Sequence, residues 1–374
     1  MTTPCIDADF PGGNIVLERV DGDDVFLRQD RRDTTIWWFY WYFRVTGAGG
    51  RRLAFHFTDG DVVGARGPAV SQDGGESWAW LGVDTQQQAG FEYTFAPECD
   101  EARFCFAVPY LADDLSRLVD GLGDTPHLRI GTLCTSRQGR RVELIRAGRL
   151  DGDCAHKVLL TCRHHCCEMM ASYVLEGILQ GVLGAGEEGR WLRQNVELCA
   201  IPFVDKDGVQ DGDQGKNRAP RDHNRDYEGD SIYPETEAIR RLAPSWSGGK
   251  LGLALDLHCP YIKGGRNETA YFVGLPQPGQ WVALTRFSEL LEQTREGDIP
   301  YRAEDNLPFG LEWNTSENFG AGKSFAGWAF EQPGVELAAT LEVPYANARG
   351  VAMTAPSARA LGRDLARVIC EFLR

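Results

Sequence analysis

Polar and apolar residues follow one another in two different ways along this chain, and the change falls near residue 115. Before it, short alternating or aromatic-rich runs are separated by turns rich in glycine. These runs predict strands over residues 14–19, 35–45, 52–57, 91–95 and 102–108, with a turn at 71–78 leading into another strand. Short strands joined by turns are typical of a sandwich, so we expect an all-β sandwich domain over residues 1–115.

The run at 35–45 reads TIWWFYWYFRV and carries an aromatic residue at nearly every position. Such rings can form a platform for a ligand, or they can pack in the core and between domains. We favour packing, because aromatic side chains bury a large apolar area.

From residue 116 onward, strand-like runs alternate with helical ones. Continuous apolar runs predict buried strands over 157–162, 196–204, 251–257 and 336–343. The spacing of apolar residues predicts helices over 167–183, 235–242, 280–294 and 358–373. This order indicates an α/β domain over residues 116–374, with a mixed, largely parallel sheet flanked by helices.

Charge and composition exclude several classes of partner. The 374 residues carry 39 Lys and Arg against 54 Asp and Glu, a net charge of −15, which argues against a nucleic-acid or anionic-membrane partner. No apolar run approaches the roughly 20 residues of a membrane-spanning helix, and the N-terminus lacks the pattern of a secretion signal. Eleven cysteines, an odd number, are interpreted as reduced thiols. We therefore expect a cytoplasmic protein.

Three of the seven histidines follow predicted buried strands, where open α/β sheets bind their ligands. His165 and Glu168 come after one strand and are three positions apart, and His258 ends another. A His, a Glu and a distant His are a ligand set for zinc that keeps one position open. The alternatives are polar residues that merely satisfy strand ends, or a Cys-His site made by His165 with the adjacent Cys166 and Cys167.

Two further features fit chemistry beside such a metal. The polar loop 216–226 contains Arg218, Arg221 and the pair Asn224-Arg225. An arginine there can stabilise an oxyanion, and an Asn-Arg pair can hold a carboxylate, although a solvated loop is equally polar. Glu342 lies near the end of an apolar strand, where a carboxylate is costly unless it is paired or acts as a general base.

These residues together resemble the M14 family of zinc carboxypeptidases, in particular the subgroup similar to cytosolic carboxypeptidases, which carry a β-sandwich before the catalytic domain. The N-terminal part matches through Gly13-Asn14, the aromatic run and SQDGGESW. The catalytic motifs follow in family order: HCCE (His165, Glu168), GKNR (Arg218), DHNR (Asn224, Arg225), PET (Pro234, Glu235, Thr236), LDLH (His258) and TLEV (Glu342).

The resemblance implies roles for these residues. Glu342 would activate the attacking water, and Arg218 would polarise the scissile carbonyl and steady the oxyanion. Asn224 and Arg225 would hold the terminal carboxylate of the substrate. One zinc ion per chain would be bound by three ligands: His165, Glu168 and His258.

Some positions depart from the family pattern. Cys-Cys stands between the ligands of the first motif, where the family usually has Pro-Gly. The loop from Arg218 to Arg225 is shorter than in the subgroup, so Arg221 is a rival for the oxyanion role. The mobile tyrosine of the family, which closes over the substrate, aligns with Phe319. Residues 325–327 align with the side-chain pocket and suggest a roomy or apolar one.

We therefore predict a zinc metallocarboxypeptidase that hydrolyses the C-terminal amide bond of peptides. Its substrates would be peptides or small amides with a free C-terminal carboxylate, and the sandwich would narrow the mouth of the site. Acidic peptide tails, peptidoglycan stem peptides and small dipeptide-like metabolites are candidates. The alternatives are a zinc deacylase of N-acyl amino acids, resembling desuccinylase or aspartoacylase, and a non-catalytic peptide-binding module.

Overall fold

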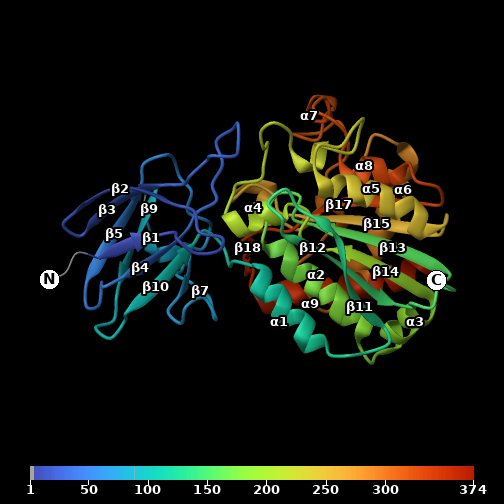
Figure 1. The fold of residues 1–374 in the computed structure, drawn as a ribbon, viewed down its shortest axis with the longest axis horizontal. Helices are drawn as coiled ribbons and strands as arrows, with labels where there is room; N and C mark the ends of the chain where they lie inside the picture. The colour runs from blue at the N-terminus through green and yellow to red at the C-terminus, as the bar shows by residue number, and fades with distance from the viewer. Residues whose placement is uncertain (1–3, 88) are drawn as a thin grey trace.

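The structure, a computed structural model, describes residues 4–87 and 89–374. Figure 1 shows two parts side by side, with the strands of the first hundred residues on one side and a larger layered part on the other. Both parts of the predicted architecture are present, an N-terminal part built on β-sheets and an α/β part.

Two five-stranded sheets form the N-terminal sandwich. The first contains, in spatial order, β1 (Cys5–Asp7), β4 (Tyr42–Thr46), β10 (Glu101–Cys105), β6 (Ala69–Ser71) and β7 (Ala79–Trp80). The second contains β2 (Val16–Asp21), β3 (Asp24–Arg28), β5 (Arg52–Phe57), β9 (Gly90–Thr94) and β8 (Gln86–Gln87). Between them lie fully buried rings: Trp41, Phe43, Phe55, Phe91 and Phe104.

The aromatic run is mostly not a strand, which corrects the prediction for 35–45. Only β4 forms at its end, and residues 36–41 lie outside the strands. The backbone of Tyr40 instead bonds to the Gln214 amide, with Tyr40 N donating to Oε1 at 2.8 Å. Phe39 packs edge-on against Tyr345 of the other part, at 5.7 Å between ring centroids. The aromatic run therefore packs in the core and between the two parts, and the backbone of Tyr40 bonds across the junction to Gln214.

A seven-stranded mixed sheet is the centre of the second part. Its spatial order is β11 (Leu128–Thr135), β12 (Arg141–Gly148), β14 (Val196–Ile201), β13 (His156–Cys162), β15 (Leu251–His258), β17 (Leu337–Glu342) and β16 (Tyr271–Val273). The four predicted strands, β14, β13, β15 and β17, are mutually parallel. The strands that the pattern missed, β11, β12 and β16, are added antiparallel at the two edges.

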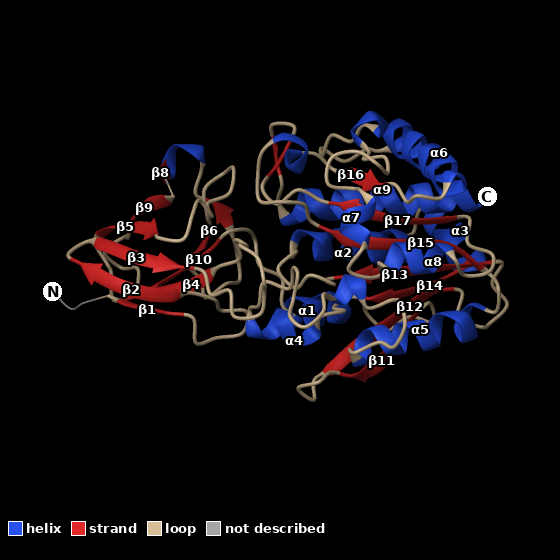
Figure 2. Ribbon diagram, turned by 90° about the horizontal axis from the view of Figure 1, so that it is seen from above, coloured by secondary structure: helices blue, strands red, loops and turns tan. Residues whose placement is uncertain are grey.

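Helices cover both faces of this sheet (Figure 2). Alternate residues of the strands enter different cores: Val158 packs in the core that includes α2 and α9, and Leu159 packs in the core that includes α5 and α8. The α-helices are α1 (Ala112–Leu122), α2 (Met170–Leu183), α3 (Glu187–Asn195), α4 (Lys206–Asp211), α5 (Pro234–Ser247), α6 (Pro278–Thr294), α7 (Ser316–Phe319), α8 (Phe325–Phe330) and α9 (Ala355–Leu373). A small hairpin, β18 (Asn347–Ala348) and β19 (Val351–Ala352), precedes α9.

The junction between the two parts is polar as well as aromatic. The Asp33 carboxylate of the sandwich accepts hydrogen bonds from Gln214 N at 2.9 Å and Gly215 N at 2.8 Å. Lys263 Nζ donates to Asp61 at 2.7 Å. The domain boundary predicted after residue 115 falls inside α1 and stays a prediction. None of the described helices is both long and apolar enough to cross a membrane.

Candidate metal and catalytic site

The carboxyl ends of three neighbouring parallel strands gather the site residues. β13, β15 and β17 lie next to one another, and His258 is the register partner of Glu342. The residues after β13 carry His164 and His165 to the same edge. Ligands bind at this edge in open α/β sheets, so the strand order itself brings the predicted residues together.

His165, Glu168 and His258 form a compact buried cluster. Glu168 accepts through both oxygens, with Oε1 at 2.7 Å from His165 Nδ1 and Oε2 at 2.7 Å from His258 Nδ1. The two Nδ1 atoms are 3.1 Å apart. One donor atom from each residue lies within 4.8 Å of the others. Two imidazole nitrogens and a carboxylate facing one point are a donor set that suits zinc.

The outer nitrogen of each of these histidines contacts a carboxylate. His165 Nε2 lies 3.2 Å from Asp222 Oδ1, and His258 Nε2 lies 2.7 Å from Asp256 Oδ2. Such contacts fix the ring orientation and make a histidine a better metal ligand. Sequence reasoning missed both aspartates. Asp256 could have been found, because it lies two positions before His258 and so on the same face of β15.

A second group of possible ligands, His164, Asp256 and His258, shares one member with the first. His164 is fully buried, and both of its nitrogens already have partners. Nδ1 lies 2.8 Å from Asp256 Oδ1, and Nε2 lies 2.8 Å from the Tyr227 hydroxyl. We therefore assign His164 to the wall that supports the cluster of His165, Glu168 and His258.

The ligand-bearing loop is held from behind by Arg163. Its backbone has a φ of 62°, which turns the chain sharply after β13. Its guanidinium donates to Cys166 O and Tyr110 O. The thiol of Cys166 lies 3.0 Å from Asp213 O and that of Cys167 lies 4.0 Å from the Tyr345 hydroxyl, so the structure does not favour the Cys-His alternative. Because residues 163–169 form this loop, α2 begins at Met170 rather than at 167.

Glu342 is a buried carboxylate that is not fully hydrogen-bonded. It is 8% exposed, and its Oε2 has no hydrogen-bond partner. Burial raises its pKa to about 7. None of the described residues forms an ion pair with it, so the strand-end salt bridge is not seen.

Two adjoining cavities open over these residues. The inner one, about 50 Å³, is lined by His165, His258, Asn224, Arg225 and Glu342 together with Lys216, Val273, Leu275, Trp313, Asn318, Ser324 and Thr340. The outer one, about 530 Å³, is lined by Trp38 of the sandwich and by Tyr261 and Tyr271 of the α/β part. Lys216, Trp313, Asn318 and Glu342 line both. The candidate site is thus a small buried chamber with a wider vestibule.

Asn224 and Arg225 lie in the chamber wall, on a short 3-10 helix over His223–Arg225. Asn224 Oδ1 accepts from Phe325 N at 2.8 Å. The Arg225 guanidinium is oriented by Asn318, with Nε donating to its backbone oxygen and Nη2 to its Oδ1, both at 3.1 Å. Burial lowers the pKa of Arg225.

Neither Arg218 nor Arg221 lies in either cavity. Arg218 donates to Asp205 Oδ2 at 2.6 Å and to Asp213 Oδ2 at 2.8 Å, and Asp33 Oδ2 lies 3.6 Å away. Burial alone would lower the pKa of Arg218, but these carboxylates outweigh it and raise that pKa. Arg221 donates to Asp226 at 2.6 Å. The structure therefore does not bring the predicted oxyanion arginine to the site.

Two other predicted positions have different outcomes. Phe319 is the last residue of α7, and its side chain lies outside the part that the structure describes. The expected pocket at 325–327 is not formed there, because Phe325 packs inward against Tyr227 at 5.5 Å and His164 at 5.7 Å. Ser324 takes its place in the chamber wall.

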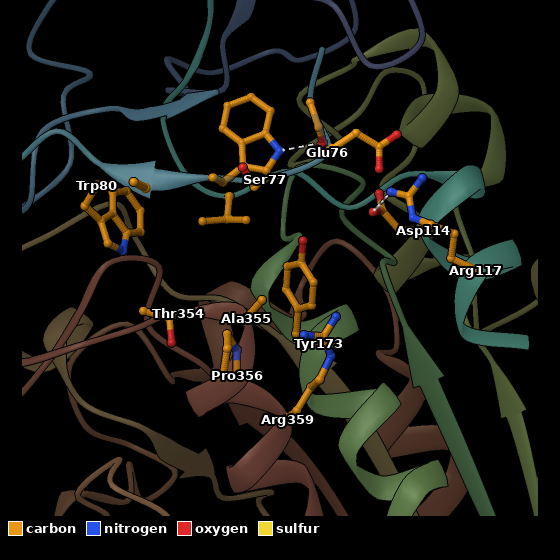
Figure 3. Close-up of a pocket in the computed structure, with 14 residues that line it drawn as sticks. Glu76, Ser77, Trp80, Asp114, Arg117, Tyr173, Thr354, Ala355, Pro356 and Arg359 are labelled. Carbon is orange, nitrogen blue, oxygen red and sulfur yellow. Dashed lines mark hydrogen bonds and ion pairs between the residues drawn. The ribbon is translucent and has the colours of Figure 1, made fainter. Parts of the chain in front are cut away.

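A separate cavity of about 320 Å³ lies at the junction of the two parts (Figure 3). Trp80 of the sandwich faces the start of α9 there, and its Nε1 donates to Met353 O at 2.6 Å. Tyr173 and Arg359 come from the α/β part. Neither possible ligand group lies in its lining, so we do not assign the chemistry to it.

Comparisons with known proteins agree with this geometry. No family model matches the chain. The metallo-carboxypeptidase of Burkholderia cenocepacia superposes over 99% of both chains, with a TM-score of 0.81 and 21% identity. The chain has the metallo-carboxypeptidase fold. A second similar structure is a metallo-carboxypeptidase of Pseudomonas aeruginosa in complex with (2-guanidinoethylmercapto)succinic acid. The superposition spans 99% of this chain and 100% of that one, with a TM-score of 0.76 and 22% identity.

Relatives in sequence bear the corresponding names. Mouse cytosolic carboxypeptidase 3 is 30% identical over 156 residues, which are 39% of this chain and 16% of that protein. An uncharacterized protein of Zymomonas mobilis is 25% identical over 232 residues, 59% of each chain. The match thus spans less than two thirds of either relative. The resemblance to cytosolic-carboxypeptidase-like M14 proteins, predicted from the motifs, is confirmed.

Proposed function

We propose that the protein is a zinc metallocarboxypeptidase, which hydrolyses the C-terminal amide bond of a peptide with a free terminal carboxylate. The observation that carries this proposal is one buried chamber lined by the two histidines of the His-Glu-His cluster, by a carboxylate with an unpartnered oxygen and by an arginine. The metallo-carboxypeptidase fold supports the same activity. The eleven unpaired cysteines support a reducing compartment, the cytoplasm.

His165, Glu168 and His258 would hold one zinc ion per chain. When bound, zinc polarises a carbonyl and lowers the pKa of a water molecule. Asp222 and Asp256 keep the two histidines turned toward the ion by contacting their outer nitrogens. The donor set, its burial and these supporting carboxylates all fit such an ion.

Glu342 acts as the general base and then as the acid. Its carboxylate removes a proton from the attacking water while the water oxygen bonds to the carbonyl carbon. The same proton passes to the leaving nitrogen as the carbon–nitrogen bond breaks. An oxygen without a hydrogen-bond partner is available for this work, which a paired carboxylate would not be.

Asn224 and Arg225 hold the terminal carboxylate of the substrate. A guanidinium binds a carboxylate through two parallel hydrogen bonds, and Asn318 keeps this one in the chamber wall. The Pseudomonas neighbour was solved with a succinic acid derivative, which also carries carboxylates. Recognition of the free carboxylate would restrict cleavage to the chain end.

The test is hydrolysis before and after metal exchange. A panel of C-terminally varied peptides and N-acyl amino acids is incubated with zinc-loaded protein, with chelator-treated protein and with the treated protein after zinc is restored. We expect release of single C-terminal residues that disappears with the metal and returns with it. Cleavage of only the N-acyl amino acids would identify the deacylase instead, and no cleavage of either class would leave the binding module.

A further inference from the structure

The chamber and vestibule contain only two cationic side chains among the described residues that line them. Arg225 lines the chamber, and Lys216 lines both. Since Arg225 is assigned to the terminal carboxylate, Lys216 is the cation that remains for a second negative charge. It lies beside Glu342, the proposed base, in both linings.

Arg218 cannot supply that charge without breaking buried ion pairs. Its guanidinium is bonded to Asp205 and Asp213, with Asp33 close by, and its side chain is 13% exposed. Turning it toward the chamber would leave the buried Asp205 carboxylate without its arginine partner, which is costly in a protein interior. Asp205 is also the N-cap of α4, with Oδ1 accepting from Gly208 N at 2.9 Å. The arginine is therefore part of a structural ion-pair network.

The backbone between the two cations explains why they separate. Asn217 has a φ of 47°, in the left-handed region, so the chain turns between Lys216 and Arg218. Asn217 N donates to Asp222 Oδ2 at 2.8 Å, which ties this turn to the aspartate that contacts His165. One side of the turn thus faces the carboxylate network, and the other faces the chamber.

The sandwich holds the lysine-bearing segment in place. The Thr34 hydroxyl donates to Lys216 O at 2.6 Å, and Gly215 N donates to Asp33 Oδ2 at 2.8 Å. Gly215 presses on the ligand loop so closely that a Cβ there would lie 2.4 Å from Cys166 N. The N-terminal domain therefore fixes the distance between Lys216 and the metal-ligand loop.

The Lys216 ammonium group lies against an aromatic ring of the vestibule wall. The Trp38 ring lies 5.9 Å from Lys216 Nζ. Because Trp38 lines the vestibule, this contact places the ammonium group on the vestibule side of the reacting space.

We propose that Lys216, positioned by the Asp33–Thr34 segment of the sandwich, stabilises the negative charge that forms on the carbonyl oxygen of the substrate. This assignment rests on the proposed function. When the water oxygen bonds to the carbonyl carbon, the electron pair of the C=O bond moves to that oxygen, and the lysine ammonium donates a hydrogen bond to it. When the bond to nitrogen breaks, the electron pair returns and the carbonyl re-forms.

The first experiment compares Lys216→Met and Lys216→Arg with the zinc-loaded parent protein. For Lys216→Met we expect kcat to fall about 10²- to 10³-fold, as when an oxyanion-stabilising donor is removed, with KM and zinc content within about threefold. Lys216→Arg keeps the charge and should retain activity within about tenfold. Arg218→Lys is the matched control at the neighbouring cation. Arg218→Lys should lower the melting temperature and leave kcat within about threefold of the parent value, because Arg218 belongs to a structural ion-pair network.

A second variant tests the positioning by the sandwich. Thr34→Val removes the hydroxyl that holds Lys216 O and should lower kcat about three- to tenfold while KM and zinc content stay constant. Thr35→Val, whose hydroxyl donates at 3.2 Å to the next carbonyl, Asn217 O, should lower kcat less.

Three outcomes overturn the proposal in distinguishable ways. If the parent protein cleaves peptides and Lys216→Met cleaves them equally well, the lysine assignment is wrong and the proposed function stands. A large fall in kcat for Arg218→Lys without loss of stability would return the role to the arginine. If the parent protein with full zinc cleaves no peptide, both proposals fall together.

Discussion

Glu342 and Glu235 are alike as side chains and differ in their surroundings. Each is buried, at 8% and 2% exposure, and each has one oxygen without a hydrogen-bond partner. Burial raises the pKa of both to about 7. Glu342 faces the chamber beside His165 and His258, whereas Glu235 lies in the first turn of α5 and lines neither the chamber nor the vestibule.

The difference shows what makes a perturbed carboxylate functional. A raised pKa and an unpartnered oxygen arise where a carboxylate is buried without enough hydrogen-bond donors or cations to replace the water that it loses. Of the two, only Glu342 has the proposed metal ligands and an open space within reach. Glu235 instead lies near Asp205 and Asp207, which raise its pKa further. Glu235 thus serves as an internal control for Glu342.

The largest change we expect follows removal of a proposed metal ligand, Glu168. Glu168→Ala deletes the carboxylate that bridges His165 and His258, so two imidazoles alone would remain. Zinc affinity should fall more than about 100-fold, beyond the effect of losing a supporting contact. Competition with a chromogenic chelator measures it. Glu187→Ala, an exposed site on α3, should keep parental affinity, and retention of zinc by Glu168→Ala would contradict the site.

The next change concerns stability at Glu235. The Glu235 carboxyl holds its proton more tightly in the folded protein than in the unfolded chain, where its pKa is near the ordinary 4.5. Ionisation of Glu235 therefore does not change the free energy of unfolding below that pH. Above it, ionisation lowers the free energy of unfolding increasingly until about pH 7, and the loss then stays constant. At about 1.4 kcal/mol per pH unit, Glu235→Gln should gain on the order of 3 kcal/mol over wild type at pH 8 and almost nothing at pH 4.

Urea unfolding at several pH values measures this gain. Glu237→Gln, at a 60% exposed side chain on the same helix, is the control and should show no such pH dependence. An equal gain for Glu235→Gln at pH 4 and pH 8 would mean that lost contacts, rather than ionisation, set the difference.

The smallest change that we expect is in zinc affinity, after substitution of Asp256 behind the chamber. Asp256 contacts His258 through Oδ2 and His164 and Thr161 through Oδ1. Asp256→Asn should weaken zinc binding about 10- to 100-fold, because the histidine loses its charged partner. Thr161→Val alters only the Oδ1 side and should change zinc affinity less than about threefold. Equal effects of the two variants would show that Asp256 acts on the fold alone.

The central strands and the clustering of His165, Glu168 and His258 could be predicted because their signals are local. Apolar runs without alternation mark the four parallel strands, and strand ends in such a sheet converge. β11 was missed because polar residues interrupt its apolar ones and none of its side chains is buried. β16 was missed because it has only three residues. The aromatic run was misread because its backbone bonds to Gln214, which lies far away in the chain.

The choice between Lys216 and Arg218 lay beyond the sequence for a related reason. The two cations are two positions apart in one polar loop, and either side chain is long enough to reach a neighbouring site. What separates them is the left-handed turn at Asn217 together with carboxylates from distant segments, Asp33 and Asp205. Tertiary contacts between such distant segments produce no pattern in the local sequence.

The most direct test of the account compares Glu342→Gln with Glu235→Gln on one peptide library of varied C-termini. Both proteins are loaded with zinc, and products are read by mass spectrometry beside the parent. The account predicts that the parent and Glu235→Gln release single C-terminal residues, while Glu342→Gln, with full zinc, is slower by at least about 10²-fold. Cleavage by Glu342→Gln at the parental rate would contradict it.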